Sequence, residues 1–147
     1  MTESPERSES PAPADAGILR VLLVEDSVPL AERISALIRT MPGVELVTAV
    51  ASERAAVEAV ANQRVDAIVL DLNLQQGNGF GVLRSLRTRA LAVSVIVFTS
   101  YDIPAYRRAA SALGATEFLH KARDYDKLPA VLGRLAASQA SDYRASA

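Results

Sequence analysis

The stretch VDAIVLDLN, residues 65–73, decides the fold that this sequence can adopt. Apart from Asp66 it is an unbroken apolar run that ends at Asp71, and such a run predicts a strand buried on both faces. The run LRVLLVED, residues 19–26, has the same form and also ends in acidic residues. Because the carboxyl ends of parallel strands meet at one rim of an open α/β sheet, where ligands bind, we expect Asp26 and Asp71 to lie close together.

Strand and helix patterns alternate on both sides of these two runs. Apolar residues recur at helical spacing between the strands, for example at Leu30, Ile34 and Ile38. We expect strands at 19–24, 44–50, 65–70, 93–98 and 116–119, helices after caps at Ser27, Ser52, Asn78 and Asp102, and a last helix around 128–136. These units predict an α/β fold, a five-stranded doubly wound parallel sheet of order 2-1-3-4-5 with helices on both faces.

The ends of the chain differ in composition from its centre. The chain has 147 residues, enough for one domain with a sizeable core. Residues 1–17 are rich in proline, serine and acidic residues, and we expect a disordered tail because they cannot bury enough apolar surface to offset their ordering entropy. The folded domain is expected over 18–137, and residues 138–147 form either a short C-terminal tail or a frayed continuation of the last helix.

Composition excludes several classes of protein. Apolar residues make up 50% of the chain and charged residues 22%, and the net charge of −1 gives no overall case for nucleic-acid binding. The chain has no cysteine, which excludes disulfides, thiolate catalysis and cysteine-based zinc sites. No apolar run is long enough to span a bilayer and no secretory signal pattern is present, so we expect no membrane association and a cytoplasmic location.

Three carboxylates are expected at the rim, those of Glu25, Asp26 and Asp71. A bound divalent cation would relieve their mutual repulsion, and hard oxygen ligands select Mg²⁺ or Mn²⁺ over softer metals. We expect Asp26 and Asp71 to bind the cation directly and Glu25 to act through water. A backbone carbonyl near Asn73 could complete the site.

Asp71 is the candidate nucleophile, because a carboxylate can attack a phosphoryl group to give an aspartyl phosphate. Lys121 can place its ammonium on one phosphoryl oxygen, and Thr99 can donate its hydroxyl to another. Taken singly, such residues are more often caps, solvated turns or surface lysines; their joint placement at strand ends favours a site. His120, the only histidine, is interpreted as a partly exposed structural residue, because strand alternation turns it away from the side of Lys121.

Four segments resemble the receiver domain of two-component response regulators: VLLVEDS (21–27), DAIVLDLNL (66–74), VIVFTS (95–100) and GATEFLHKA (114–122). The resemblance covers about residues 18–137 and implies a flavodoxin-like receiver fold. It implies that Asp71 accepts a phosphoryl group from a sensor histidine kinase or a histidine phosphotransfer protein. It also implies that Glu25 and Asp26 hold magnesium, that Thr99 and Lys121 bind the phosphoryl group, and that Phe118 is the switch aromatic.

The resemblance further implies a switching surface that signals to a protein partner. This surface is made of the fourth helix, fifth strand and fifth helix, and it changes as Thr99 approaches the phosphoryl group and Phe118 turns inward. Here it would include Tyr106, Arg107, Arg108, Phe118, Arg123 and Tyr125. Such a protein catalyses only its own phosphotransfer and autodephosphorylation, and is a monomer or a phosphorylation-dependent dimer. Given the length of the chain, the resemblance is to stand-alone, single-domain regulators. Such proteins act by binding a partner or by passing phosphate along a relay.

The sequence departs from the family pattern after Lys121, where Ala122 replaces the usual proline, often in a cis bond. A non-proline cis bond costs about 2.5–4 kcal/mol, so we expect a trans bond and a differently shaped turn. The loop after Asp71 also lacks the Met-Pro pair often seen in the family, which we interpret as ordinary variation.

Three other functions are alternatives to the one that this resemblance implies. A phosphorylation-independent interaction module on the same fold is supported only by Ala122. A nucleotide- or flavin-binding protein is disfavoured, because the loop after the first strand has no glycine and carries two acids that would repel a phosphate. A nucleic-acid role rests only on Arg84, Arg87 and Arg89, or on Arg107 and Arg108, and short arginine clusters on solvated helix faces are common.

Overall fold

One parallel sheet organises the molecule, a computed structural model that describes residues 17–146. Its strands are β1 (Leu19–Val24), β2 (Val44–Val50), β3 (Ala67–Leu70), β4 (Ser94–Thr99) and β5 (Glu117–His120). All pairings are parallel and the strand order is β2-β1-β3-β4-β5, which confirms the predicted topology. The tail predicted over 1–17 lies outside the described residues, apart from Gly17.

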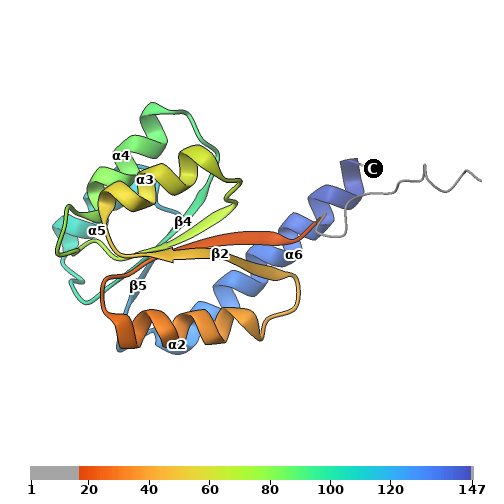
Figure 1. The fold of residues 1–147 in the computed structure, drawn as a ribbon, viewed down its shortest axis with the longest axis horizontal. Helices are drawn as coiled ribbons and strands as arrows, with labels where there is room; N and C mark the ends of the chain where they lie inside the picture. Colours follow the sequence, from red (N-terminus) through yellow and green to blue (C-terminus); the bar gives the residue numbers. More distant parts are fainter. Residues whose placement is uncertain (1–16, 147) are drawn as a thin grey trace, which may run out of the picture.

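Helices cover both faces of the sheet (Figure 1). They are α2 (Val28–Arg39), α3 (Glu53–Asn62), α4 (Gly79–Thr88), α5 (Pro104–Ala112) and α6 (Leu128–Ser146), with a short 3₁₀ turn, η1 (Tyr125–Lys127), before the last. Helices α3, α4 and α5 lie on one face, and α2 and α6 lie on the other (Figure 1). Side chains on opposite sides of the central strands form two separate apolar clusters, as expected for a doubly wound sheet.

Three of the four predicted caps start their helices as expected. Ser27 accepts a hydrogen bond from the Leu30 amide, Ser52 from the Ala55 amide, and Asn78 from the Gly81 amide. The fourth prediction is wrong: Ile103, not Asp102, is the N-cap of α5, and its side chain makes no capping bond. Pro104 opens this helix without an N–H to satisfy, and the Asp102 carboxylate binds two arginines instead.

The last helix is longer than its apolar pattern indicates. Residues 138–146 continue α6 without a break, which is the second of the two alternatives for this segment. Other boundaries move by one or two residues, as for β5, which begins at Glu117 rather than Thr116. Within residues 17–146 no helix combines the length and the apolar character needed to cross a bilayer.

Candidate functional site

The acidic residues lie at the carboxyl ends of β1 and β3, the two strands at the switch point of the sheet. Val24 and Leu70 are paired across these strands. Beyond them, the Asp71 amide donates to the Val24 carbonyl at 3.0 Å, and the Glu25 amide donates to the Val50 carbonyl at 2.9 Å. The backbone hydrogen bonds of the sheet therefore continue one residue beyond β1 and β3. They fix the backbone positions of Glu25 and Asp71, from which the two carboxylates project.

Glu25, Asp26 and Asp71 each offer a carboxylate oxygen, and these oxygens lie within 4.8 Å of one another. Glu25 and Asp71 are both only 4% exposed, and Asp26 is half-buried. Three hard oxygen donors at this spacing fit a cation such as Mg²⁺, which binds few carboxylates directly and keeps several waters. The predicted carboxylate cluster therefore forms in the fold.

Backbone amides orient all three carboxylates. The Ser27 amide donates to Glu25 Oε2 at 2.9 Å, and the Asn73 amide donates to Asp71 Oδ1 at 3.1 Å. The Gln75 amide donates to Asp26 Oδ2 at 2.6 Å, a contact that the sequence did not reveal because its partners are 49 residues apart. Asn73, the predicted carbonyl ligand, thus lies directly beside the carboxylate of Asp71.

Lys121 reaches the same cluster from the end of β5. Its Nζ lies 2.8 Å from Glu25 Oε1 and 2.8 Å from Asp71 Oδ2. Burial opposes the charge on this ammonium, but the hydrogen bonds to Asp71 and Glu25 outweigh it and raise the pKa of Lys121. Burial raises the pKa of Glu25, and the bonds from Lys121 and the Ser27 amide offset part of that rise. The lysine is therefore a fixed cation against the candidate acceptor.

Thr99 is the last residue of β4 and is fully buried at the same rim. Its Oγ1 accepts a hydrogen bond from the Tyr101 amide at 3.3 Å, and its carbonyl accepts one from the Lys121 amide at 3.0 Å. Thr99 and Lys121 are therefore joined by a backbone hydrogen bond. Phe118 lies in β5, partly buried, with the Arg107 guanidinium 4.6 Å from the centre of its ring.

The residues of the predicted partner surface differ in their surroundings. Tyr106 packs edge-to-face on Phe80, with ring centres 5.4 Å apart, and Arg107, Arg108 and Arg123 are exposed. Tyr125 does not belong to this surface, which corrects the prediction. Its ring contacts Phe98 and Arg33 of α2 and packs against the apolar cluster on the face of the sheet opposite to Tyr106 and Phe118.

A charged cluster that the sequence did not reveal joins the two loops that follow β4 and β5. Arg107 donates to Asp102 through Nε at 2.5 Å and through Nη2 at 3.2 Å, and Arg123 donates to the same carboxylate. The Arg107 bonds, joined by those of Arg123, lower the pKa of Asp102 to about 2. Asp102 therefore ties the loop after Thr99 to the loop after Lys121.

His120 organises the turn that contains Ala122. Its Nδ1 accepts hydrogen bonds from the Ala122 and Arg123 amides, both at 3.1 Å, and its own amide donates to Asp124 Oδ2 at 2.9 Å. This agrees with a partly exposed structural histidine. No cis peptide bond occurs among residues 17–146, so the bond between Lys121 and Ala122 is trans, as expected.

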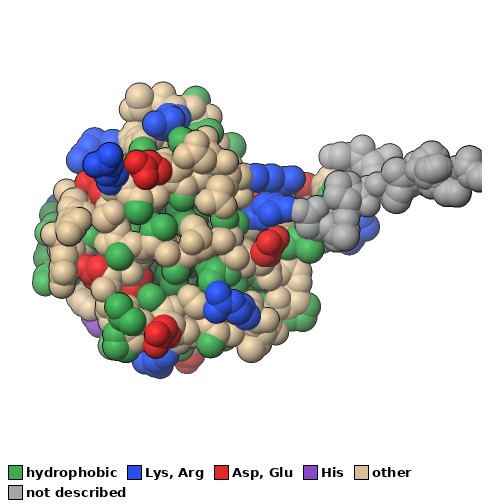
Figure 2. All heavy atoms as spheres, viewed as in Figure 1, with side chains coloured by type: hydrophobic (Ala, Val, Ile, Leu, Met, Phe, Trp, Pro, Cys, Tyr) green, Lys and Arg blue, Asp and Glu red, His purple; other side chains and the backbone are tan. Residues whose placement is uncertain are grey.

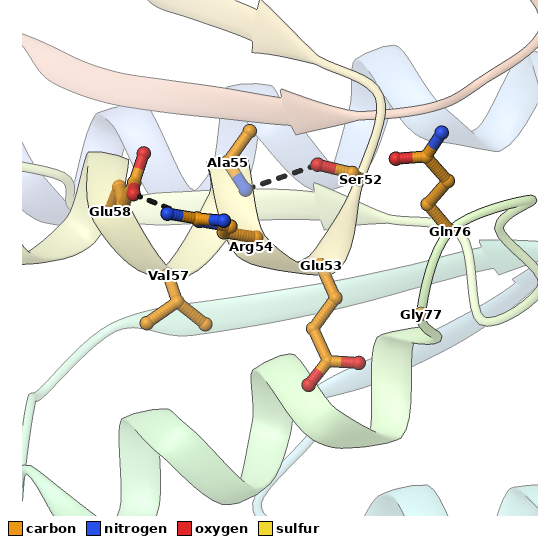
Figure 3. A pocket seen from close by; sticks show the side chains of 8 residues that line it. All are labelled: Ser52, Glu53, Arg54, Ala55, Val57, Glu58, Gln76 and Gly77. Carbon is orange, nitrogen blue, oxygen red and sulfur yellow. Dashed lines mark hydrogen bonds and ion pairs between the residues drawn. The ribbon is translucent and has the colours of Figure 1, made fainter.

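Two hollows lie near the rim. One, of about 460 Å³, is lined by Glu25, Asp26 and side chains of α2. The other, of about 720 Å³, is lined by the first turns of α3 and by Gln76 and Gly77 of the loop after β3, and none of the three clustered carboxylates is among its lining residues (Figure 3). In the view of Figure 2, acidic and basic side chains are scattered among apolar and polar surface, without a basic patch suited to nucleic acid.

Comparison with known proteins agrees with this geometry. Residues 21–133 match the family model of the response regulator receiver domain. The chain is 36% identical over 112 residues to the response regulator protein PmrA of Pseudomonas aeruginosa, covering 76% of this chain and 50% of that protein. It is 31% identical over 120 residues to a protein-glutamate methylesterase/protein-glutamine glutaminase of Nocardioides, covering 82% of this chain and 31% of that protein. The chain thus spans only about a third to a half of these relatives.

Solved structures share the same fold. The receiver domain of Francisella response regulator 1452 aligns with a TM-score of 0.73 and 21% identity, covering 82% of this chain and 98% of that domain. The response regulator domain of Thermotoga maritima CheB aligns with a TM-score of 0.72 and 21% identity, covering 84% of this chain and 97% of that domain. The carboxylate cluster and the lysine that bridges Glu25 and Asp71 agree with the matched family model. The chain therefore belongs to the response regulator receiver domain family.

Proposed function

We propose that the protein accepts a phosphoryl group on Asp71 from a sensor histidine kinase or a histidine phosphotransfer protein. The observation that carries this proposal is the position of Lys121 Nζ, 2.8 Å from carboxylate oxygens of both Asp71 and Glu25. A cation in contact with the acceptor and with a second buried carboxylate suits a site that must gain a dianionic group. The family supplies the class of donor, a phosphorylated histidine.

In the transfer, an Asp71 carboxylate oxygen forms a bond to phosphorus while the bond from phosphorus to the donor imidazole nitrogen breaks. The leaving nitrogen keeps the electron pair of that bond. The Asn73 amide holds one carboxylate oxygen and Lys121 holds the other, so the acceptor is oriented before the donor arrives. Lys121 and the Thr99 hydroxyl then bind oxygens of the transferred group.

Mg²⁺ or Mn²⁺ fits the donor set at this rim. Asp26, Asp71 and the Asn73 carbonyl would hold the ion, with Glu25 acting through water. When bound, the ion would neutralise negative charge on the incoming phosphoryl group. Glu25 also keeps Lys121 in place, which its 2.8 Å contact supports.

We propose that phosphorylation signals through Thr99, Phe118 and the charged surface of α5 and β5. Thr99 shares a backbone bond with Lys121, and Arg107 covers the ring of Phe118 while bound to Asp102. Movement of Thr99 would therefore act on the arginines that a protein partner meets. No catalysis on a second substrate is proposed, and the cytoplasm remains the proposed location, which the absence of cysteine supports.

Intact mass after incubation with acetyl phosphate and magnesium tests the proposal. Wild type should gain one phosphoryl group, and Asp71→Ala should gain none. Asp66→Ala is a matched control, because Asp66 directly precedes β3, at the end of the strand opposite to Asp71. There it accepts a hydrogen bond from the Arg20 amide. Equal phosphorylation of Asp71→Ala, or no binding of beryllofluoride by wild type, would contradict the proposal.

A further inference from the structure

One residue of α3 fastens the loop that follows the candidate acceptor. The backbone amide of Glu53 donates to the Gln76 carbonyl at 3.1 Å, and its side-chain Oε1 accepts from the Asn78 amide at 3.0 Å. These two contacts lie on either side of Gly77. Figure 3 shows the Glu53 side chain pointing away from α3 toward this loop and the first turn of α4.

Two glycines make the space that this carboxylate fills. A Cβ atom at Gly77 would overlap Cβ of Glu53, and a Cβ atom at Gly81 would overlap its carboxylate oxygens. Gly77 also has a φ of +83°, which favours glycine. The carboxylate lies at the amino end of α4, where unpaired amides favour negative charge. Glu53, Gly77 and Gly81 therefore fit one another as a set.

The fastened loop is the one that restrains the acceptor. Asn78, held by Glu53, pairs with Asn73 in an isolated antiparallel bridge. Asn73 donates to Asp71 Oδ1, and Gln75, also in this loop, donates to Asp26 Oδ2. Backbone hydrogen bonds thus lead from the Glu53 carboxylate through Asn78 and Asn73 to Asp71. Asp26 is linked to the same loop through Gln75, which lies between the two asparagines in the chain.

We infer that Glu53 is a positioning residue for the phosphoacceptor and cation site. This inference rests on the proposed function of Asp71. Glu53 does not touch the reacting atoms; it holds the loop that presents the Asn73 carbonyl and orients the carboxylates of Asp26 and Asp71. Groups that hydrogen-bond metal ligands directly typically change metal affinity on the order of 10- to 100-fold when they are removed. Glu53 acts through Asn78, so the low end of this range is expected for its removal.

Titration of the full-length chain with Mn²⁺, followed by electron paramagnetic resonance of the free ion, tests the inference without any phosphotransfer. Glu53→Ala should weaken the Kd about 10-fold, and Glu53→Gln, which keeps an acceptor oxygen, should recover most of that loss. Hydrogen exchange should be faster across 72–78 in Glu53→Ala. The matched control is Glu58→Ala on the same helix, whose exposed carboxylate binds Arg54; its Kd should match wild type (Figure 3).

A second variant tests the same contact from the first turn of α4. Gly81→Ala displaces the Glu53 carboxylate and should weaken Mn²⁺ binding as Glu53→Ala does. In a Glu53→Ala background, the further effect of Gly81→Ala should be small, because the two changes remove one interaction. An unchanged Kd in both Glu53→Ala and Gly81→Ala would overturn the inference. A wild type that binds no Mn²⁺ would instead contradict the proposed function.

Discussion

The two flanks of the candidate site are held by different forces. The acceptor flank, residues 25–26 and 71–78, is fixed by backbone amides that donate to Glu25, Asp26 and Asp71. The switch flank consists of residues 99–107 and 117–124. Its two segments are joined by Arg107 and Arg123, which both bind the carboxylate of Asp102 near the surface. Backbone bonds near a buried strand end resist change, whereas exposed ion pairs contribute little and break readily.

This difference suits a protein that must hold an acceptor still while another surface moves. On the acceptor flank a shift would misplace the carboxylates. On the switch flank the ion pairs of Asp102 with Arg107 and Arg123 can be exchanged at small cost, and Arg107 also lies over the ring of Phe118. We therefore expect substitutions on the acceptor flank to affect stability and metal binding, and substitutions on the switch flank to affect conformational equilibrium.

Lys121, which bridges the two flanks, should give the largest effect. Lys121→Ala leaves the buried carboxylates of Glu25 and Asp71 without their cation, which should lower the free energy of unfolding by roughly 3 kcal/mol. Magnesium should restore more stability to this variant than to wild type, because the ion supplies positive charge at the same place. Urea denaturation with and without magnesium measures both effects. Equal stability of variant and wild type without the ion would contradict this description.

Gly79→Ala should cause the next largest loss of stability, and it tests how rigid the backbone of the acceptor flank is. An added Cβ would lie 2.6 Å from the Asp71 carbonyl oxygen and 2.8 Å from Leu72 Cα, both backbone atoms of the acceptor loop. Overpacking of this kind should destabilise by roughly 1–3 kcal/mol. At Gly133 in α6 an added Cβ meets nothing within 4 Å, so Gly133→Ala should stabilise by roughly 0.5–1 kcal/mol. Thermal or urea unfolding of the pair checks the contrast.

Asp102→Asn should have a smaller effect that depends on pH. The arginines hold the pKa of Asp102 at about 2, below its ordinary value of 3.8, so its carboxylate stabilises the fold above pH 3.8. That contribution is lost as the pH falls through about 2. The difference in urea midpoint between wild type and Asp102→Asn should therefore be largest near neutral pH and shrink between pH 4 and pH 2. A difference that does not change over this range would contradict the role given to the carboxylate.

The smallest expected effect is a difference between the two flanks in how their hydrogen exchange responds to salt. Exposed ion pairs are screened at 1 M salt, where the Debye length is about 3 Å. Hydrogen exchange across 121–124 should become faster in high salt, because the Arg123 link to Asp102 weakens. Exchange across 71–73 should change little, because the Asn73 amide donates to the buried carboxylate of Asp71, where salt screens the interaction less. Equal acceleration of both segments would remove the distinction.

The sequence alone predicts the strands and helices whose apolar residues recur with a regular period. The apolar runs ending at Asp26 and Asp71 gave the strands, and the parallel order then placed both acids at one rim. Lys121 and Thr99 could be placed there too, because each lies at the end of a strand. These are consequences of topology, and they need no knowledge of side-chain conformation.

Contacts between loops could not be predicted in the same way. The bonds of Asp102 to Arg123 and of Glu53 to Asn78 join residues 21 and 25 apart, with no periodic pattern to mark them. Asp102 looked like a cap because a short acidic residue before a helix usually is one. Tyr125 follows β5 in a loop without a periodic pattern, so the sequence does not indicate that its ring packs on Phe98, on the other face of the sheet.

The central claim is that an acyl phosphate on Asp71 moves the switch flank while the acceptor flank stays in place. Hydrogen exchange of wild type and Asp71→Ala, with and without beryllofluoride and magnesium, tests it most directly. We predict that exchange in wild type changes across 99–107 and 117–124, that 72–78 becomes only more protected, and that Asp71→Ala does not respond. An unchanged switch flank in wild type, or the same response in Asp71→Ala, would contradict the claim.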